Sequence, residues 1–173
     1  QKADAQLFML PLNPLFPSKK MYRDGVAVIT REMERSFPQA KTLNMLPSYL
    51  AYREAIHAGA YDALLVDREG NITEGTRTNL FAMKDRKLFT HDPQKILLGV
   101  TRKTVLRAAA ESGFTVETAR IMPTDMGTYD CAFLTGTSIG MLRIASVDGA
   151  SIGNTTTAFE ELWRAFGVID ARG

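Results

Sequence analysis

The sequence predicts a mixed α/β fold with a largely antiparallel sheet. Short runs rich in β-branched and aromatic residues recur along the chain, and tight turns separate several neighbouring runs, as in hairpins. Three longer segments between these runs have the apolar spacing of helices. Because strands outnumber helices and short turns join several of them, antiparallel pairing is expected to dominate the sheet.

The expected strands are short, and the turns that join them contain glycine or aspartate. Residues 67–71 and the pair Asp85-Arg86 are predicted to be hairpin turns. The run at residues 61–67 is apolar almost throughout, which predicts a strand buried on both faces. The remaining expected strands cover residues 25–30, 72–74, 80–83, 87–90, 115–118, 132–134 and 144–147.

Three helices are expected, and their ends carry recognisable cap residues. Asn44 and Thr101 are the predicted N-caps of the first two helices. Gly59 and Gly113 are expected to end those helices, since glycine readily adopts a left-handed backbone. The predicted helices cover residues 43–58, 99–112 and 158–166, and a shorter turn or helix is expected at 123–127.

Residues 1–20 differ from the rest of the chain. Residues 5–10 resemble a strand entered in mid-course, and residues 11–17 contain three prolines, which favour an extended connector. We therefore expect residues 1–20 to be the tail of a preceding domain and its linker, with an ordinary N-terminal arm as the alternative. Residues 21–173 are long enough for one domain with a sizeable core.

The composition is that of a soluble globular protein, with 45% hydrophobic and 23% charged residues and a net charge of +2. No run of Lys and Arg suggests nucleic-acid binding, and no apolar run approaches the roughly 20 residues that span a membrane. Cys131 is the single cysteine, so an internal disulfide is excluded and a cytoplasmic location is expected. Cys131 is predicted to be a buried core thiol, and no metal site is expected.

Lys41 and Glu74 are the strongest candidates for chemistry. Lys41 directly precedes the first long predicted helix, and Glu74 follows a tight turn and precedes Gly75. A lysine that loses its proton part of the time can hold an aldehyde as an imine. A carboxylate can keep a ring nitrogen protonated, which suits the electron-sink chemistry of pyridoxal phosphate. Taken singly, these residues are better explained as a solvated surface lysine and an exposed glutamate at a strand end, and only their combination with further motifs favours the chemical role.

Two further segments could hold a phosphate. Residues 99–101 begin a helix, where free amides and the helix dipole favour an anion. Residues 135–138 form a polar turn with hydroxyls and a glycine amide, although such a turn need not bind anything. His91 fits an ordinary turn residue. Arg77 and Arg143 could each bind a substrate carboxylate or simply lie at the surface.

Together, four segments in this order resemble the class IV aminotransferases, the fold-type IV pyridoxal-phosphate enzymes. The segments are KTLNML at 41–46, a signature within 60–81 that includes ITEGTRTNLF, LGVTR at 98–102 and FLTGTS at 133–138. The family includes branched-chain aminotransferase, D-amino-acid aminotransferase and aminodeoxychorismate lyase. The resemblance extends from about residue 38 to 147. It implies that residues 21–173 form the cofactor-binding C-terminal domain, with a barrel-like sheet flanked by helices.

The resemblance also implies roles for individual residues. Lys41 would bind the cofactor aldehyde and carry a proton to and from the substrate, and Glu74 would bind the pyridine nitrogen. Ser138 and Ile139 would lie near the substrate carboxylate. The Val100 and Thr101 amides and the Thr137 hydroxyl would hold the phosphate, and the full set of implied cofactor-binding residues is Lys41, Glu74, Thr78, Asn79, Gly99, Val100, Thr101, Gly136 and Thr137.

The implied activity is transfer of an amino group between an amino acid, of the branched-chain or D-amino-acid class, and a 2-oxo acid, by a homodimer. A lyase that releases pyruvate and an inactive cofactor-domain fragment remain as alternatives. Leu46 stands where branched-chain members often have a tyrosine, which favours the D-amino-acid or lyase branches. Members also carry an N-terminal domain with a phosphate-binding arginine, and residues 1–20 are the part of this chain that resembles its end.

Overall fold

The protein is described by a computed structural model that covers residues 7–11, 16–153 and 157–170. The strands are β1 (Val26–Glu32), β2 (Asp62–Val66), β3 (Ile72–Gly75), β4 (Asn79–Lys84), β5 (Lys87–Thr90), β6 (Thr115–Thr118), β7 (Cys131–Gly136), β8 (Gly140–Val147) and β9 (Ala150–Ser151). The α-helices are α1 (Lys19–Asp24), α2 (Leu46–His57), α3 (Val100–Glu111) and α4 (Thr157–Asp170), and the 3-10 helices are η1 (Pro38–Ala40), η2 (Pro93–Lys95) and η3 (Pro123–Thr128).

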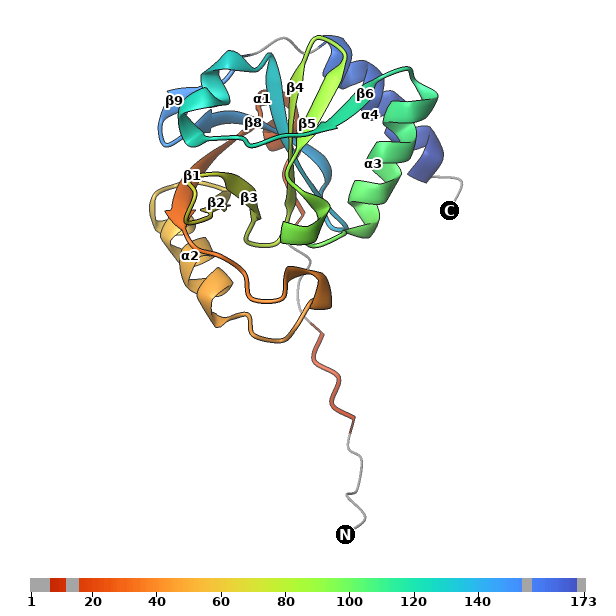
Figure 1. Cartoon of the computed structure of the whole chain (residues 1–173). Helices are drawn as coiled ribbons and strands as arrows, with labels where there is room; N and C mark the ends of the chain where they lie inside the picture. Colours follow the sequence, from red (N-terminus) through yellow and green to blue (C-terminus); the bar gives the residue numbers. More distant parts are fainter. Residues whose placement is uncertain (1–6, 12–15, 154–156, 171–173) are drawn as a thin grey trace.

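The strands form one sheet that closes into a barrel (Figure 1). The order β3-β2-β1-β8-β7-β4 is closed by pairing of β3 with β4, while β5 and β6 extend from β4 and β9 pairs with β8. Six of the nine pairings in the described chain are antiparallel, which confirms the predicted mixed α/β fold with its largely antiparallel, barrel-like sheet. The parallel β1–β2 pair is joined through α2, as a crossover connection requires.

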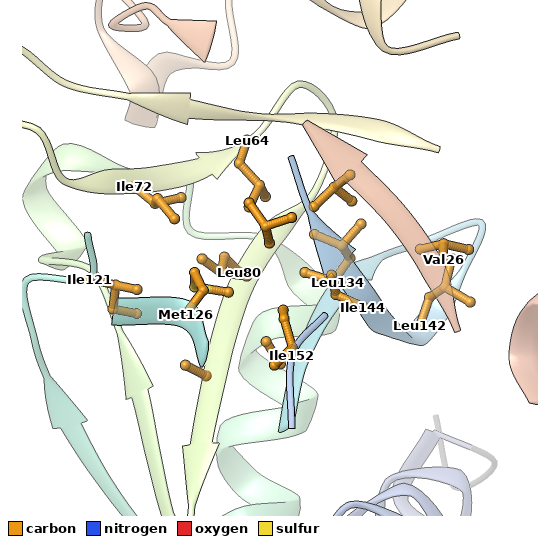
Figure 2. Close-up of a cluster of buried hydrophobic side chains, with 14 of the residues drawn as sticks. Val26, Leu64, Ile72, Leu80, Ile121, Met126, Leu134, Leu142, Ile144 and Ile152 are labelled. Carbon is orange, nitrogen blue, oxygen red and sulfur yellow. The ribbon is translucent and has the colours of Figure 1, made fainter. Parts of the chain in front are cut away.

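Alternation along the strands divides the apolar residues between two cores. In β4, Leu80 and Ala82 belong to the cluster inside the barrel, whereas Phe81 and Met83 face outward. Figure 2 shows Leu80 and Leu134, from neighbouring strands, among the side chains gathered inside the barrel. The sheet is therefore buried on both faces at β4 and β7, which explains their continuous apolar sequences.

Helices cover the outer face of the barrel. α3 and α4 pack side by side over β4, β5 and β7 through a cluster that includes Phe133, Val105 and Leu162 (Figure 1). α2 covers β2 through the small residues Ala51 and Ala55. Within the described ranges, every helix falls short of the length and apolar character needed to cross a membrane.

Both predicted N-caps were wrong. α2 begins at Leu46 with Met45 in the cap position rather than Asn44, and a proline occupies its first turn. α3 begins at Val100 with Gly99 as its N-cap rather than Thr101. A Cβ atom at Gly99 would lie 2.6 Å from Oδ1 of Asn79. Because any larger side chain would clash there, the cap position requires glycine.

The N-terminal segment also differs from the expectation. Residues 7–10 were predicted to continue a strand, but they are exposed and have no regular structure, and they extend away from the barrel (Figure 1). The rest of the predicted strand and most of the proline-rich segment, residues 5, 6 and 12–15, lie outside the described residues. α1, capped by the Ser18 hydroxyl, was not predicted.

Candidate active site

A cavity of about 190 Å³ lies where the η1–α2 segment, the β3–β4 connection, the start of α3 and the end of β7 meet. These stretches are far apart in the sequence, and the barrel brings them together. All nine residues expected to bind the cofactor line this cavity: Lys41, Glu74, Thr78, Asn79, Gly99, Val100, Thr101, Gly136 and Thr137.

Lys41 reaches the cavity from an unusual backbone conformation. It follows η1 with φ 45° and ψ 50°, in the left-handed region that few residues other than glycine adopt. Such a conformation persists where the surroundings hold it, and it fixes the direction in which the side chain leaves the chain. Lys41 is exposed.

Glu74 lies at the end of β3 and is 2% exposed. Its Oε1 accepts a hydrogen bond from Arg35 Nε at 2.9 Å. Its Oε2 accepts from the backbone N–H of Leu97 at 3.1 Å and from Asn79 Nδ2 at 3.3 Å. Burial raises the pKa of Glu74, while the charge and hydrogen bond of Arg35 and the Leu97 amide oppose this rise. The carboxylate is thus fixed in place at the wall of the cavity.

Arg35 was missed by the sequence reasoning. Besides Glu74, its guanidinium donates to the carbonyl oxygen of Thr76 at 2.8 Å and to that of Gly75 at 3.4 Å. It lies three residues after β1, in a segment with no apolar period or motif to mark it. The only available signal was topological: β1 lies beside β2 and β2 beside β3, so a cation just beyond β1 can reach a carboxylate at the end of β3.

A second buried carboxylate supports the turn after Glu74. Asp62 accepts hydrogen bonds from the hydroxyls of Thr76 and Thr78, the latter at 2.9 Å. Burial raises the pKa of Asp62, and these hydroxyl hydrogen bonds oppose the rise. A Cβ atom at Gly75 would lie 2.7 Å from Asp62 Oδ2, so glycine is needed between Glu74 and this network. Thr78 already donates its hydroxyl proton and keeps only acceptor capacity for a ligand.

The start of α3 presents free donors at another part of the cavity wall. The backbone amides of Val100, Thr101 and Arg102 belong to the first helical turn, where no intrahelical acceptor exists. Gly136 and Thr137, from the end of β7, line the same cavity. Two buried polar atoms of lining residues have no hydrogen-bond partner within the described part of the chain, namely Arg102 Nε and Thr135 Oγ1. Unused donors of this kind fit an anionic group.

Ser138 and Ile139, which the resemblance places near the substrate carboxylate, are not among the residues that line this cavity. The Ile139 side chain belongs to the barrel core, and its backbone N–H donates to the Gly136 carbonyl oxygen at 3.1 Å. Its own carbonyl oxygen accepts from the Tyr22 hydroxyl at 2.9 Å. The turn therefore uses the polar groups of Ile139 internally, while Ser138 is exposed.

The other candidates fall into two groups. Arg77 lines the cavity, with its guanidinium carbon 4.1 Å from the ring centroid of Tyr52. Arg143 lies elsewhere, buried and donating to the Asp24 carbonyl oxygen at 2.8 Å. Cys131 is a core thiol as predicted, and burial raises its pKa to about 12. Of these residues, only Arg77 is placed to meet a ligand in the cavity.

Comparisons with known proteins agree with this geometry. The family model for amino-transferase class IV matches residues 2–147. A branched-chain-amino-acid aminotransferase of Pseudomonas aeruginosa is 35% identical over 144 residues, which is 80% of this chain and 47% of that protein. A D-alanine aminotransferase of Bacillus licheniformis is 31% identical over 143 residues, covering 82% and 50%.

Solved structures extend the similarity to the fold. The structure of a T.th. branched-chain amino acid aminotransferase with pyridoxamine 5′-phosphate superposes with a TM-score of 0.77 at 29% identity, covering 90% of this chain and 55% of that one. The chain spans about half the length of the curated relatives that it matches. With a family model over most of its length and the predicted motifs around one cavity, the chain belongs to the class IV aminotransferase family.

Proposed function

We propose that this chain is the cofactor-binding part of a pyridoxal 5′-phosphate-dependent aminotransferase, which moves an amino group between an amino acid and a 2-oxo acid. The observation that carries the proposal is that Lys41, Glu74 and the first amides of α3 line one cavity. Branched-chain amino acid aminotransferases of similar fold have been solved with pyridoxamine 5′-phosphate and with a phosphopyridoxyl-glutamate adduct, which supports this cofactor.

Each residue has a distinct task in this proposal. When bound, the cofactor supplies an aldehyde that combines with amines and a ring that withdraws electrons. Glu74, which Arg35 and the Leu97 amide hold in position, would accept a hydrogen bond from the protonated ring nitrogen. The amides of Val100 and Thr101 hold the phosphate. Nζ of Lys41 would hold the aldehyde carbon covalently, with the aldehyde oxygen leaving as water, and once released it would move a proton at the α-carbon of the substrate.

The substrate is inferred to carry an apolar side chain. A second cavity of about 320 Å³ shares Met45 and Arg77 with the first and is also lined by Leu46 and Tyr49. Its apolar wall suits an aliphatic side chain, and the exposed guanidinium of Arg77 suits a carboxylate. Relatives named for branched-chain amino acids and for D-alanine support the same class of small, largely aliphatic substrates.

A homodimer is part of the same proposal. Large apolar side chains are exposed on and just before α2, beside the cavity: Leu43 is 96% exposed and Leu46 65% exposed. Exposed apolar surface of this kind is typical of a protein interface. Light scattering of the purified protein measures this directly, and a monomer at micromolar concentration would contradict it. The lyase alternative is not favoured, because the relatives from Pseudomonas aeruginosa and Bacillus licheniformis are both named as aminotransferases.

The deciding experiment is borohydride trapping of pyridoxal phosphate on the purified protein, followed by peptide mass spectrometry. We expect a visible absorbance band that borohydride abolishes, with the reduced adduct on Lys41. Lys41→Ala should lose the band and the adduct, whereas Lys103→Ala, an exposed lysine on α3, should keep both. Formation of a 2-oxo acid from an amino acid, in proportion to amination of an acceptor 2-oxo acid, identifies transamination. Pyruvate released without an acceptor would instead indicate the lyase.

A further inference from the structure

We propose that the short helix α1 fixes the turn between β7 and β8, and that Tyr22 is a positioning residue for the cavity that this turn lines. The inference rests on the proposed function and deepens it, because it adds a residue that lies outside the cavity lining. The turn consists of residues 136–140. Two of them, Gly136 and Thr137, line the cavity together with Lys41 and Glu74.

Contacts with the rest of the fold, rather than its own sequence, explain why α1 is a helix. It has six residues and none of them is buried, so neither its length nor an apolar face stabilises it. At its start the Ser18 hydroxyl accepts from the Met21 N–H at 3.3 Å. At its end the buried guanidinium of Arg143, on β8, donates to the carbonyl oxygens of Asp24 at 2.8 Å and Arg23 at 3.3 Å. These bonds fasten α1 to β8.

Tyr22 connects the fastened helix to the turn. Its hydroxyl donates to the Ile139 carbonyl oxygen at 2.9 Å, across 117 residues of sequence. Burial raises the pKa of Tyr22, so the hydroxyl keeps its proton and remains a donor at neutral pH. A phenylalanine at this position would keep the ring and lose only this hydrogen bond.

The turn transmits the restraint from Ile139 to the cavity. The Ile139 N–H donates to the Gly136 carbonyl oxygen at 3.1 Å, which closes the turn. The Ile139 side chain is buried in the barrel core, and a Cβ atom at Gly136 would lie 3.6 Å from it. The N–H, the carbonyl oxygen and the side chain of Ile139 are thus all engaged. Ile139 therefore holds Gly136, and Thr137 beside it, in one position.

Such a restraint favours binding because the tip of the turn is exposed. Thr137 and Ser138 are both exposed, and a loose turn would lose conformational freedom when it met a ligand. Tyr22 and α1 remove that freedom before the ligand arrives. The part of the cofactor that meets Thr137 is the phosphate, according to the family resemblance. Tyr22 should consequently affect binding of the phosphate and not of the aldehyde end.

The test compares pyridoxal 5′-phosphate with pyridoxal, which lacks the phosphate. Both aldehydes are trapped on Lys41 with borohydride over a series of concentrations, and the ratio of their dissociation constants measures the contribution of the phosphate. We expect Tyr22→Phe to lower the preference for the phosphorylated aldehyde by about 3- to 10-fold, which corresponds to one lost hydrogen bond. The binding of pyridoxal should stay unchanged.

Tyr129→Phe is the matched control. Tyr129 is also partly buried, but its ring contacts Phe89 and it lies outside the cavity lining. Both dissociation constants should therefore keep their wild-type values in this variant. A similar loss of preference in Tyr22→Phe and Tyr129→Phe would overturn the inference.

Amide hydrogen exchange of the ligand-free protein separates positioning from a purely structural role. Tyr22→Phe should speed exchange of the Ile139 N–H several-fold, while the amides of β4 and β7 exchange at wild-type rates. Faster exchange throughout the sheet, with equal loss of both aldehydes, would mean that Tyr22 only stabilises the fold and would overturn the inference. Unchanged exchange at Ile139, or an unchanged preference for the phosphorylated aldehyde, would overturn it as well.

Failure of the proposed function looks different. In that case neither aldehyde would be trapped on Lys41 of the wild type, and the positioning role would be refuted with it. If the wild type traps both aldehydes and Tyr22→Phe binds them in the wild-type ratio, only the role of Tyr22 is refuted.

Discussion

At one end of the cavity Glu74 has a partner for each carboxylate oxygen, whereas elsewhere in the wall Arg102 and Thr135 keep buried polar atoms without partners among the described residues. The first charge is already balanced within the chain by Arg35, and the second is not balanced within the part of the chain that the structure describes. The comparison indicates which end is preformed. The carboxylate of Glu74 has its partners within the chain, whereas Arg102 Nε and Thr135 Oγ1 have none among the described residues.

The largest effect is expected when the ion pair between Arg35 and Glu74 is removed. Arg35→Met leaves Glu74 buried without a counter-charge, and breaking such a pair from one side costs about 3–5 kcal/mol of unfolding free energy. Denaturant unfolding measures this cost. Arg31→Met removes an arginine from an exposed pair with Glu54 and should cost less than about 1 kcal/mol. Equal costs for the two variants would contradict the view that Arg35 balances a buried charge.

The stability lost in Arg35→Met should depend on pH. The pKa of Glu74 lies above its ordinary value because burial outweighs the opposing influence of Arg35, so losing Arg35 raises that pKa further. A raised pKa in the folded state means that the folded protein binds more protons than the unfolded protein, and stability falls as pH rises above the ordinary glutamate range. The deficit of Arg35→Met should therefore be greater at pH 8 than at pH 5.

Glu74→Gln should have the next largest effect. If the amide oxygen keeps the hydrogen bond from Arg35, the amide NH₂ faces two donors, the Leu97 N–H and Asn79 Nδ2. This mismatch should cost about 1–3 kcal/mol of unfolding free energy. Loss of the charge opposite the ring nitrogen should also slow amino-group transfer by about 100-fold.

Stopped-flow absorbance and denaturant unfolding test the two parts separately. Glu111→Gln, in an exposed pair with Arg107 on α3, is the control and should change neither quantity appreciably. A Glu74→Gln variant with wild-type transfer rates would show that this carboxylate does not hold the ring nitrogen.

Much of the fold was predictable because it rests on local patterns. The strands at β2, β4 and β7 were found from their continuous apolar runs, and the hairpin of β4 and β5 from its aspartate turn. α1 escaped notice because its six residues include none that is buried, so no apolar period marks it. Closure of the sheet into a barrel came only from the family resemblance, because the β1–β8 and β4–β7 pairings join strands far apart in the sequence and no turn signal marks them.

The site also contains residues that the sequence indicated and residues that only the folded structure reveals. Lys41, Glu74 and the start of α3 lie in recognisable segments, and the structure brings all of them to one cavity. Arg35, Arg102 and Thr135 were not singled out, because a buried pair or a missing partner is a property of the folded neighbourhood. No sequence pattern states that Arg102 Nε lacks an acceptor among the described residues. What the sequence missed was therefore chiefly how the charges are balanced.

The smallest expected effect comes from the contact that connects the two ends. Gly99 caps α3 and packs against Asn79, whose side chain donates to both Glu74 and the Leu97 carbonyl oxygen. A Cβ atom there would lie 2.6 Å from Asn79 Oδ1, so Gly99→Ala must push the helix start or the Asn79 amide away. We expect a cost of about 1–2 kcal/mol in unfolding free energy.

Gly99→Ala should weaken the binding of both pyridoxal and pyridoxal 5′-phosphate. The added methyl group would displace Asn79, which donates to Glu74, and would also disturb the start of α3 itself. Gly127→Ala is the control, since a Cβ atom at Gly127 meets nothing within 4 Å among the described residues. If Gly99→Ala impaired only the phosphorylated aldehyde, the two ends would be independent, and the Asn79 contact would serve the helix start alone.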